Sequence, residues 1–275
     1  MITVPPETTT ATDRRRGCAA TAAAAATTAM ATTMRLMPAI VLATSSAIRN
    51  PQSVIHSAFR IPQCIVSRVP VHIVDHPLVH DALVRLRDKD TSPEYFRQAA
   101  TRISVLLAAE ALRDMPTEDV TVETPLGPAP GRRVGRDVVV VPVLRAGLGM
   151  LDAVLELVPT ARVGHIGLQR DEMTAVASQY YSKLPARLDR SYVLMIDPML
   201  ATGGSAVAAL DLLQRSGATV IRMICIVAAP EGVALVEQHH PRVDIYTPVV
   251  DRQLNAHKYI VPGLGDFGDR LYGTV

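Results

Sequence analysis

The chain has 275 residues, of which 48% are hydrophobic and 20% charged, and its formal net charge is +2. This apolar content excludes a wholly disordered protein, and the near-balance of charges argues against a protein that binds nucleic acid through its charge. The three cysteines, Cys18, Cys64 and Cys225, are too scattered for a disulfide framework or a CxxC site. We therefore expect a reducing compartment and a buried core position for Cys225.

Residues 1–65 predict a disordered leader in front of a folded domain at 66–275. The first 60 residues contain 14 alanines, 11 threonines, six arginines and no lysine, and they have too few large apolar side chains to fold alone. A run of three arginines before the alanine-rich stretch is found in organelle targeting peptides, but we favour an untargeted tail or a start at Met30, Met34 or Met37. No apolar segment is long enough to span a membrane, so we expect no membrane partner and a cytoplasmic location.

From Pro70 on, short apolar runs alternate with segments of helical periodicity. Strands that are apolar throughout are buried on both faces, as in a parallel sheet covered by helices, so the pattern predicts an α/β fold. Ser92 and Pro93 are typical of a helix start, and Gly217 is typical of a helix end. We expect strands at 71–74, 138–143, 162–168, 192–196, 220–228 and 243–246, helices at 93–115, 150–157, 206–216 and 233–238, and a proline- and glycine-rich turn region at 124–135.

The segment from Asp197 to Ser205 joins a predicted buried strand to a predicted helix. In an open parallel sheet, ligands bind at the carboxyl ends of the strands. Thr202, Gly203, Gly204 and Ser205 can direct backbone N–H groups at a phosphate, because small residues let the backbone come close. The string is not a Walker loop, since the chain contains no GxxxxGK[ST]. TGGS alone would fit a plain turn, but the strand before it and the helix after it favour phosphate binding.

Four segments resemble those of uracil phosphoribosyltransferases in sequence, order and spacing. They are PVLRAGLGM at 142–150, VLMIDPMLATGGS at 193–205, AAPEG at 228–232 and YIVPGLGDFGDR at 259–270. The second resembles the loop of that family that binds phosphoribosyl pyrophosphate (PRPP), and the last points to the uracil branch. The resemblance covers the chain from about residue 70 to the end. It implies the type I phosphoribosyltransferase fold, a parallel-sheet α/β fold with a small hood.

The resemblance implies the reaction of uracil with PRPP to give UMP and pyrophosphate, a step of pyrimidine salvage. Positive charge develops on the ribose and negative charge on the leaving group, so the site must hold an anion and steady the sugar ring. The implied cofactor is Mg²⁺, held mainly by PRPP oxygens, with Asp266 as the candidate protein ligand. The family also implies a homo-oligomer, and some of its members are activated by GTP.

By the same resemblance, Arg145, Asp197 and Asp266 are the candidate catalytic residues. Arg145 and Arg170 would hold pyrophosphate, for which a guanidinium group is well suited, and Asp197 would face the ribose hydroxyls. The whole PRPP-binding set is Arg145, Arg170, Asp197, Pro198, Met199, Leu200, Ala201, Thr202, Gly203, Gly204, Ser205 and Asp266. The uracil-binding set is Ile260, Gly265, Asp266 and Phe267, which would read the base with backbone groups in a loop stiffened by Pro262.

Residues 173–184 would form a mobile hood that closes over the site and excludes water. The chain departs from the family pattern in three places. Gln169 stands where the family usually has tyrosine, Lys258 stands where it usually has glycine, and the hood lacks the usual proline. These departures concern the closing of the hood and the base pocket rather than a catalytic group.

Three other functions compete with this one. The first is an RNA-binding regulator on the same fold, but the chain beyond residue 60 has 22 basic and 24 acidic residues, and such a regulator needs a basic face. The second is an inactive homologue that serves as a partner subunit, which the presence of Arg145, Asp197, Thr202 and Asp266 argues against. The third is a transferase for another base, such as a purine. The histidines show no metal-site spacing, and we expect them to be structural or surface residues.

Overall fold

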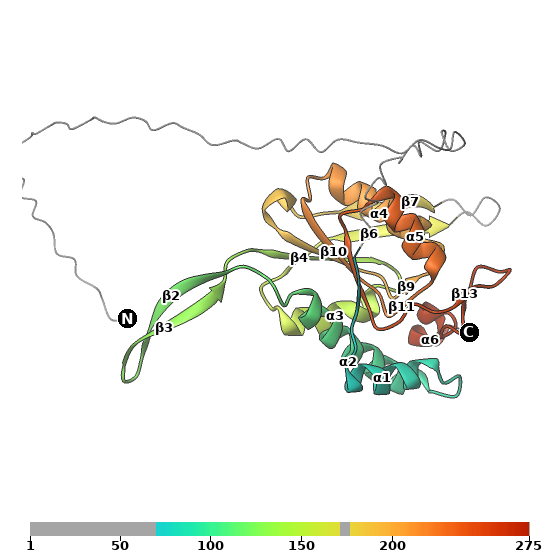
Figure 1. Ribbon diagram of the computed structural model, residues 1–275, viewed down its shortest axis with the longest axis horizontal. Helices are drawn as coiled ribbons and strands as arrows, with labels where there is room; N and C mark the ends of the chain where they lie inside the picture. Colours follow the sequence, from blue (N-terminus) through green and yellow to red (C-terminus); the bar gives the residue numbers. More distant parts are fainter. Residues whose placement is uncertain (1–69, 171–176, 275) are drawn as a thin grey trace, which may run out of the picture. The chain divides into compact units, whose positions relative to one another are not determined.

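The computed structural model describes residues 70–170 and 177–274 of the chain (Figure 1). The leader predicted for 1–65 lies outside the described residues, and so do residues 173–176 of the predicted hood. The described residues form the α/β fold that the alternation of apolar runs and helical segments predicts.

An eight-stranded sheet forms the centre of the fold, and all its pairings are parallel except that of β6 with β7. The strand order is β1 (Val71–Ile73), β12 (Asp244–Thr247), β10 (Val220–Ile224), β8 (Tyr192–Ile196), β4 (Val138–Leu144), β6 (His165–Arg170) and β7 (Ala177–Lys183), and β5 (Arg162–Val163) also pairs with β4. Because the parallel strands run in one direction, β4, β6, β8 and β10 end at the same edge of the sheet, where ligands bind in folds of this kind.

Alternate residues of the central strands enter two separate cores. In β4, Val139, Val141 and Val143 pack into one core, and Val138 and Val140 pack into the other. Helices cover both faces, which explains why these strands are apolar throughout. One face carries α1 (Pro77–Arg87), α2 (Pro93–Ala111), α3 (Leu148–Leu157) and α6 (Phe267–Tyr272), and the other carries α4 (Gly204–Arg215) and α5 (Pro230–His239) (Figure 1).

Several predicted elements are confirmed with small shifts of their ends. The strand predicted at 192–196 is β8 without change, and β4 is one residue longer than predicted. Gly217 follows α4 with φ +93°, a conformation that suits glycine. Cys225 is fully buried, as expected, and this burial raises the pKa of its thiol to about 12.

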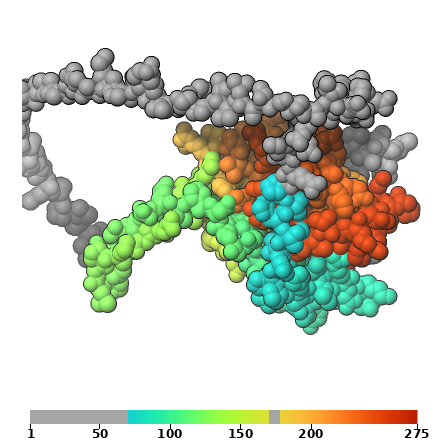
Figure 2. All heavy atoms as spheres, in the orientation of Figure 1, coloured from blue at the N-terminus to red at the C-terminus, as the bar shows by residue number. Residues whose placement is uncertain are grey.

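The segment predicted as a turn region at 124–135 belongs instead to a β-hairpin. Its strands, β2 (Thr117–Thr124) and β3 (Gly127–Val134), pair antiparallel along their whole length, and the hairpin stands out in light green in Figure 2. Pro128 and Pro130 lie within β3. A two-stranded hairpin leaves one edge of each strand unpaired, so a residue without an N–H can be accommodated there.

The helix predicted for 93–115 ends earlier, at Ala111, because a buried arginine binds the Ala111 carbonyl oxygen and the side chain of Asp114. Arg222 donates to the Ala111 carbonyl oxygen at 2.5 Å and to the two carboxylate oxygens of Asp114 at 2.5 and 2.8 Å. Its guanidinium group also lies over the rings of Tyr192 and Tyr246, 4.9 and 5.5 Å from their centres. A paired and stacked arginine can be buried without an unpaired charge, so these contacts fix the start of the loop after α2.

Three other predictions need correction. The single strand predicted at 162–168 is divided at Gly164 into β5 and β6. The single strand predicted at 220–228 is divided into β10 and β11 (Val227–Ala228), because the N–H groups of Ile226 and Val227 turn to the Pro198 carbonyl oxygen at 2.9 and 3.1 Å. The hood, predicted as a loop, contains the strand β7, which pairs with β6. The helices α1 and α6 were not predicted. Within the described residues, no helix is long and apolar enough to cross a membrane.

His240 is a buried titratable group at the end of α5. The residue is 3% exposed, and its Nε2 lies 3.2 Å from Oδ1 of Asp211, whose side chain is half exposed. Burial lowers the pKa of His240 below its ordinary value of 6.5, and the Asp211 carboxylate opposes this effect. When the folded pKa lies below the unfolded one, the unfolded chain binds more protons, so protonation favours unfolding.

We therefore expect the free energy of unfolding to fall as the pH drops from about 6.5 through the lowered pKa of His240, with a slope of at most about 1.4 kcal/mol per pH unit from this group. In His240→Gln this dependence should disappear, because the amide does not titrate. His239→Gln changes an exposed neighbour and should retain the wild-type profile. Denaturant unfolding between pH 5 and 8 measures both. An unchanged pH profile in His240→Gln would show that another group is responsible.

Candidate active site

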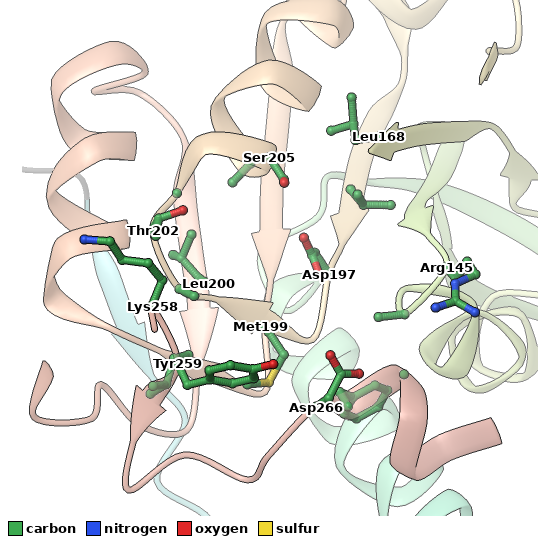
Figure 3. Close-up of a pocket in the computed structure, with 18 of the residues that line it drawn as sticks. Arg145, Leu168, Asp197, Met199, Leu200, Thr202, Ser205, Lys258, Tyr259 and Asp266 are labelled. Atoms are coloured by element: carbon green, nitrogen blue, oxygen red, sulfur yellow. The ribbon is translucent and has the colours of Figure 1, made fainter. Parts of the chain in front are cut away.

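A cavity of about 370 Å³ opens at the edge of the sheet where β4 and β8 end (Figure 3). It is lined by the loop after β4, by Leu168 of β6, by the segment between β8 and α4, by the hairpin of β13 (Gln253–Leu254) and β14 (Ile260–Val261), and by the start of α6. Several distant parts of the sequence thus meet at the carboxyl ends of parallel strands. Such a hollow is the usual ligand site of an open α/β sheet.

Arg145 enters the cavity from the loop between β4 and α3, and its side chain is exposed. The peptide bond between Leu144 and Arg145 is cis. The loop lies tightly on the end of β8, since a Cβ at Gly147 would come within 2.6 Å of the Ile196 carbonyl oxygen. Tyr272 Oη donates to the Arg145 carbonyl oxygen at 3.4 Å. The guanidinium group is therefore carried by a backbone that packs against the neighbouring strand and contacts the last helix.

The opposite wall is the segment that leads from β8 through β9 (Met199–Leu200) to α4. Asp197 is half-buried directly after β8, and its N–H donates to the Ile224 carbonyl oxygen at 3.1 Å. Gly203 is the N-cap of α4 and has φ +84°. It makes no side-chain cap, and no acidic residue stands in the first turn of the helix. The first N–H groups of α4 and the hydroxyls of Thr202 and Ser205 therefore make a site suited to a phosphate group.

Close backbone packing against α5 holds residues 198–205, the phosphate loop, in place. A Cβ at Gly232 would lie 2.5 Å from the Ala201 carbonyl oxygen, and one at Gly203 would lie 2.9 Å from the Gly232 carbonyl oxygen. The N–H of Ala229 donates to the Leu200 carbonyl oxygen at 2.8 Å. The glycine that ends the AAPEG segment is thus needed because the loop passes directly over it.

Glu231 joins α5 to the β13–β14 hairpin. Its Oε1 accepts the backbone N–H of Leu254 at 3.0 Å. This hydrogen bond is the main reason that the pKa of Glu231 is lowered, and the positive charge of Lys258 makes a smaller contribution. The same helix therefore supports both the phosphate loop and the hairpin that forms the next wall of the cavity.

The turn of this hairpin is built around Asn255, whose Oδ1 accepts the N–H groups of His257 and Tyr259 at 2.9 and 3.0 Å. The Lys258 backbone has φ +67°. These bonds present the exposed side chains of Lys258 and Tyr259 at the cavity, and buried Ile260 follows at the start of β14 (Figure 3).

The last wall is the segment before α6. Asp266 is the N-cap of that helix and accepts the Asp269 N–H at 2.9 Å, while its carboxylate also faces the cavity (Figure 3). The Phe267 side chain is 1% exposed and packs edge-on against Phe96, with 5.2 Å between ring centres. Phe267 can therefore offer a ligand its backbone but little of its ring.

Three arginines tie this segment to the helices behind it. Arg87 donates at 2.7 Å to buried Asp251, which in turn accepts the Gly263 N–H at 2.9 Å. Arg97 donates to the Leu271 carbonyl oxygen at 2.9 Å. The third, Arg270, donates to the Leu264 carbonyl oxygen at 2.7 Å and to the Leu86 and Asp88 carbonyl oxygens at the end of α1.

The structure brings most of the predicted site residues to one cavity. The members that line it are Arg145, Asp197, Met199, Leu200, Ala201, Thr202, Gly203, Ser205, Ile260, Gly265, Asp266 and Phe267. Pro198 and Gly204 do not line it, and Pro198 is buried behind the loop, where its carbonyl oxygen accepts the two N–H groups described above. Arg170 ends β6, but its side chain lies outside the described part of the structure. Gln169 is exposed and is not part of the lining.

Sequence reasoning missed His257, Lys258 and Tyr259 as lining residues. His257 was expected to be structural or on the surface, and Lys258 was noted only as a departure from the family pattern. Their position immediately before Ile260 was the available signal. A turn that places them at the cavity could not be inferred from spacing alone.

The charged groups in the lining of this cavity are Arg145, Lys258, Asp197 and Asp266. Among residues 70–170 and 177–274, no cluster of three or more His, Cys, Asp or Glu side chains could hold a metal ion. The two carboxylates could each give one ligand to a hard cation that a bound phosphate compound already coordinates. The cavity therefore fits an anionic ligand that brings its metal with it better than a resident metal ion.

Comparisons with known proteins agree with this geometry. The family model described as uracil phosphoribosyltransferase matches residues 73–274. The chain is 54% identical to the uracil phosphoribosyltransferase of Symbiobacterium thermophilum and 52% identical to that of Dictyoglomus thermophilum, in each case over 74% of this chain and at least 98% of the relative. A solved structure, the AQ2163 protein from Aquifex aeolicus, is 38% identical and has a TM-score of 0.71 over 74% of this chain and 97% of that one.

Glu231 provides a test of how the hairpin is held. In Glu231→Ala the Leu254 N–H loses its acceptor, so we expect hydrogen exchange at residues 253–261 to be faster by about three- to tenfold. Glu231→Gln keeps an acceptor oxygen at this place and should exchange nearly as the wild type does. Exchange measured by mass spectrometry distinguishes the two variants. Equal exchange in Glu231→Ala and the wild type would contradict the anchoring role.

Proposed function

The chain belongs to the uracil phosphoribosyltransferase family, and we propose that the cavity described above is where it transfers the phosphoribosyl group of PRPP to uracil. The products are UMP and pyrophosphate, and the enzyme is a glycosyltransferase of nucleotide salvage. The observation that supports the location of the site is the convergence of the β4 loop, the phosphate loop and the segment before α6 on one cavity.

We assign the 5′-phosphate of PRPP to the loop of Thr202 and Ser205. The uncapped first turn of α4 offers N–H groups and the positive end of a helix dipole, and the two hydroxyls add donors. The ribose would then extend toward Asp197, which can accept hydrogen bonds from the ribose hydroxyls. This arrangement places the anomeric carbon between the phosphate loop and Arg145.

Arg145 is assigned to the pyrophosphate, and Arg170 is proposed as a second ligand. As the bond between C1 and pyrophosphate breaks, negative charge accumulates on the leaving oxygens, and a fixed guanidinium group stabilises that charge more than it stabilises intact PRPP. The hood that contains β7 is proposed to close and exclude water, because water would otherwise attack the ribose in place of uracil.

Uracil is assigned to the wall formed by Ile260, Gly265, Asp266 and Phe267. The base is flat and neutral, with two carbonyl groups and one N3–H, so a backbone held at fixed spacing can read it. The loop is held from behind by Arg87 and Asp251. A backbone N–H aimed at the O4 position would reject cytosine, whose amino group places a donor against a donor.

The proposed cofactor is Mg²⁺, and the residues present fit it. Asp266 and Asp197 offer carboxylate oxygens to an ion held mainly by PRPP, and the described residues contain no separate metal cluster. When bound, the ion neutralises charge on the pyrophosphate. The chain's own contribution is to place the leaving group beside Arg145 and the base opposite it.

A homo-oligomer is also proposed. The β2–β3 hairpin pairs with no other strand of the described sheets, and it exposes Val122, Leu126 and Val134. We also propose GTP as an effector, as the family implies. We assign the activity to 66–275 and propose a cytoplasmic location.

The reaction can be tested with the full chain, uracil, PRPP and Mg²⁺, by following UMP. We expect the wild type to form UMP and Arg145→Ala to lose about 100- to 1000-fold in kcat/KM, because the leaving group loses a charged ligand. Arg215→Ala, at the exposed far end of α4, should retain wild-type rates. Labelled PRPP with equimolar uracil, cytosine and hypoxanthine should give UMP as the main product. A folded wild type that forms no UMP would refute the function, and an Arg145→Ala variant with wild-type rates would refute the role of Arg145.

A further inference from the structure

Lys258 is a charged residue at the cavity that the assignments above do not use. It lines the same cavity as Thr202 and Ser205. In Figure 3 its side chain lies on the side of the cavity that carries Thr202, whereas Arg145 lies on the other side, beyond Asp197 and Asp266. The two cations of the lining are therefore placed at opposite ends of the cavity.

The backbone at Lys258 is one that lysine rarely adopts. Its φ of +67° lies in the left-handed region, where glycine is accommodated without strain and a side chain with a Cβ is disfavoured. The Asn255 carbonyl oxygen accepts its N–H at 2.9 Å, so the turn itself holds this conformation. A glycine would satisfy the turn, and the lysine adds a long charged side chain beside the phosphate loop.

The ammonium group of Lys258 is not engaged elsewhere. Within the described residues it makes no hydrogen bond and no ion pair. Glu231 is the acidic group whose pKa it helps to lower, but that carboxylate already accepts the Leu254 N–H. The side chain is exposed, so it can turn toward a ligand with little rearrangement.

The phosphate loop contains no positively charged side chain. Its donors are backbone N–H groups and hydroxyls, while a phosphate monoester carries nearly two negative charges at neutral pH. On the basis of the function proposed above, we propose that Lys258 binds the 5′-phosphate of PRPP and of UMP, as a charged lid over the loop of Thr202 and Ser205. The contact is a property of the phosphate end of the ligand and does not involve the base or the leaving group.

The chain offers a direct test, because it contains only three lysines, Lys89, Lys183 and Lys258. Reductive methylation of the full chain with ¹³C-formaldehyde retains the charge and gives each lysine its own NMR signal, and Lys258→Arg identifies the signal of Lys258. We expect UMP to shift the Lys258 signal and leave that of Lys89 in place. Uridine, which lacks the phosphate, should not shift it. A Lys258 signal that ignores UMP, or responds equally to UMP and uridine, would overturn the proposal.

Binding constants provide the second measurement. In Lys258→Met the Kd of UMP and the KM of PRPP should rise by about three- to tenfold, less at high salt, with kcat nearly unchanged, because an exposed ion pair contributes modestly and is screened. Lys258→Arg should stay within about twofold of the wild type, and Lys89→Met should be indistinguishable from it. Lys258→Gly should weaken UMP binding to the same extent although it relieves the backbone.

The two proposals fail in different ways. If the wild type forms UMP and Lys258→Met binds UMP with unchanged affinity, then the role of Lys258 is wrong and the proposed function stands. If the folded wild type neither forms nor binds UMP, then the proposed function fails and the role of Lys258 fails with it.

Discussion

The position of the site depends on the pairing of β4 with β8 at the middle of the sheet. The two strands lie in parallel register from Val138 opposite Tyr192 to Pro142 opposite Ile196, so their carboxyl ends coincide. Burial of both faces by helices requires this pair to be apolar throughout, and the first polar groups can appear only where the strands leave the core. Arg145 and Asp197 occupy those first positions. The arginine proposed to bind pyrophosphate and the carboxylate proposed to face the ribose thus lie at the same edge of the sheet, although about fifty residues separate them in the sequence.

Close backbone approach is the second constraint, and glycines meet it at both loops. Gly147 lets the loop of Arg145 lie against the end of β8, and Gly232 lets the phosphate loop pass over the start of α5. Neither glycine has a side chain with which to bind a ligand. Their effect is to bring the two loops close enough that one small substrate can touch both.

The parts of the fold that follow from hydrophobic burial could be predicted from the sequence. β8 was predicted without error because all five residues of Tyr192–Ile196 are buried, which leaves an uninterrupted apolar run. The β2–β3 hairpin was not, because exposed strands with two prolines carry no such run. The end of α2 was missed because it depends on Arg222, which lies more than a hundred residues away. Tertiary contacts of this kind leave no local signal.

In the candidate site, too, the parts with a local sequence signal could be predicted and the parts that depend on tertiary contacts could not. The phosphate loop could be inferred from the residues, since a strand, an acid, small residues and a helix follow one another in the chain. The wall of Ile260 and residues 265–267, which is proposed to bind uracil, could be predicted only from the resemblance to a family, because arginines far away in the sequence hold it in position. The turn around Asn255 places His257, Lys258 and Tyr259 at the cavity, and no local sequence pattern predicts that turn.

The anchoring of the last helix has a practical consequence for protein engineering. Arg97 holds the Leu271 carbonyl oxygen, and Tyr272 contacts the loop of Arg145, so the chain passes the cavity only a few residues before Val275. A purification tag or fluorescent fusion at the carboxyl terminus would therefore follow directly after the contacts of Leu271 and Tyr272 and would disturb them. Handles for immobilisation or imaging are better attached at the opposite terminus, about seventy residues ahead of β1 in the sequence.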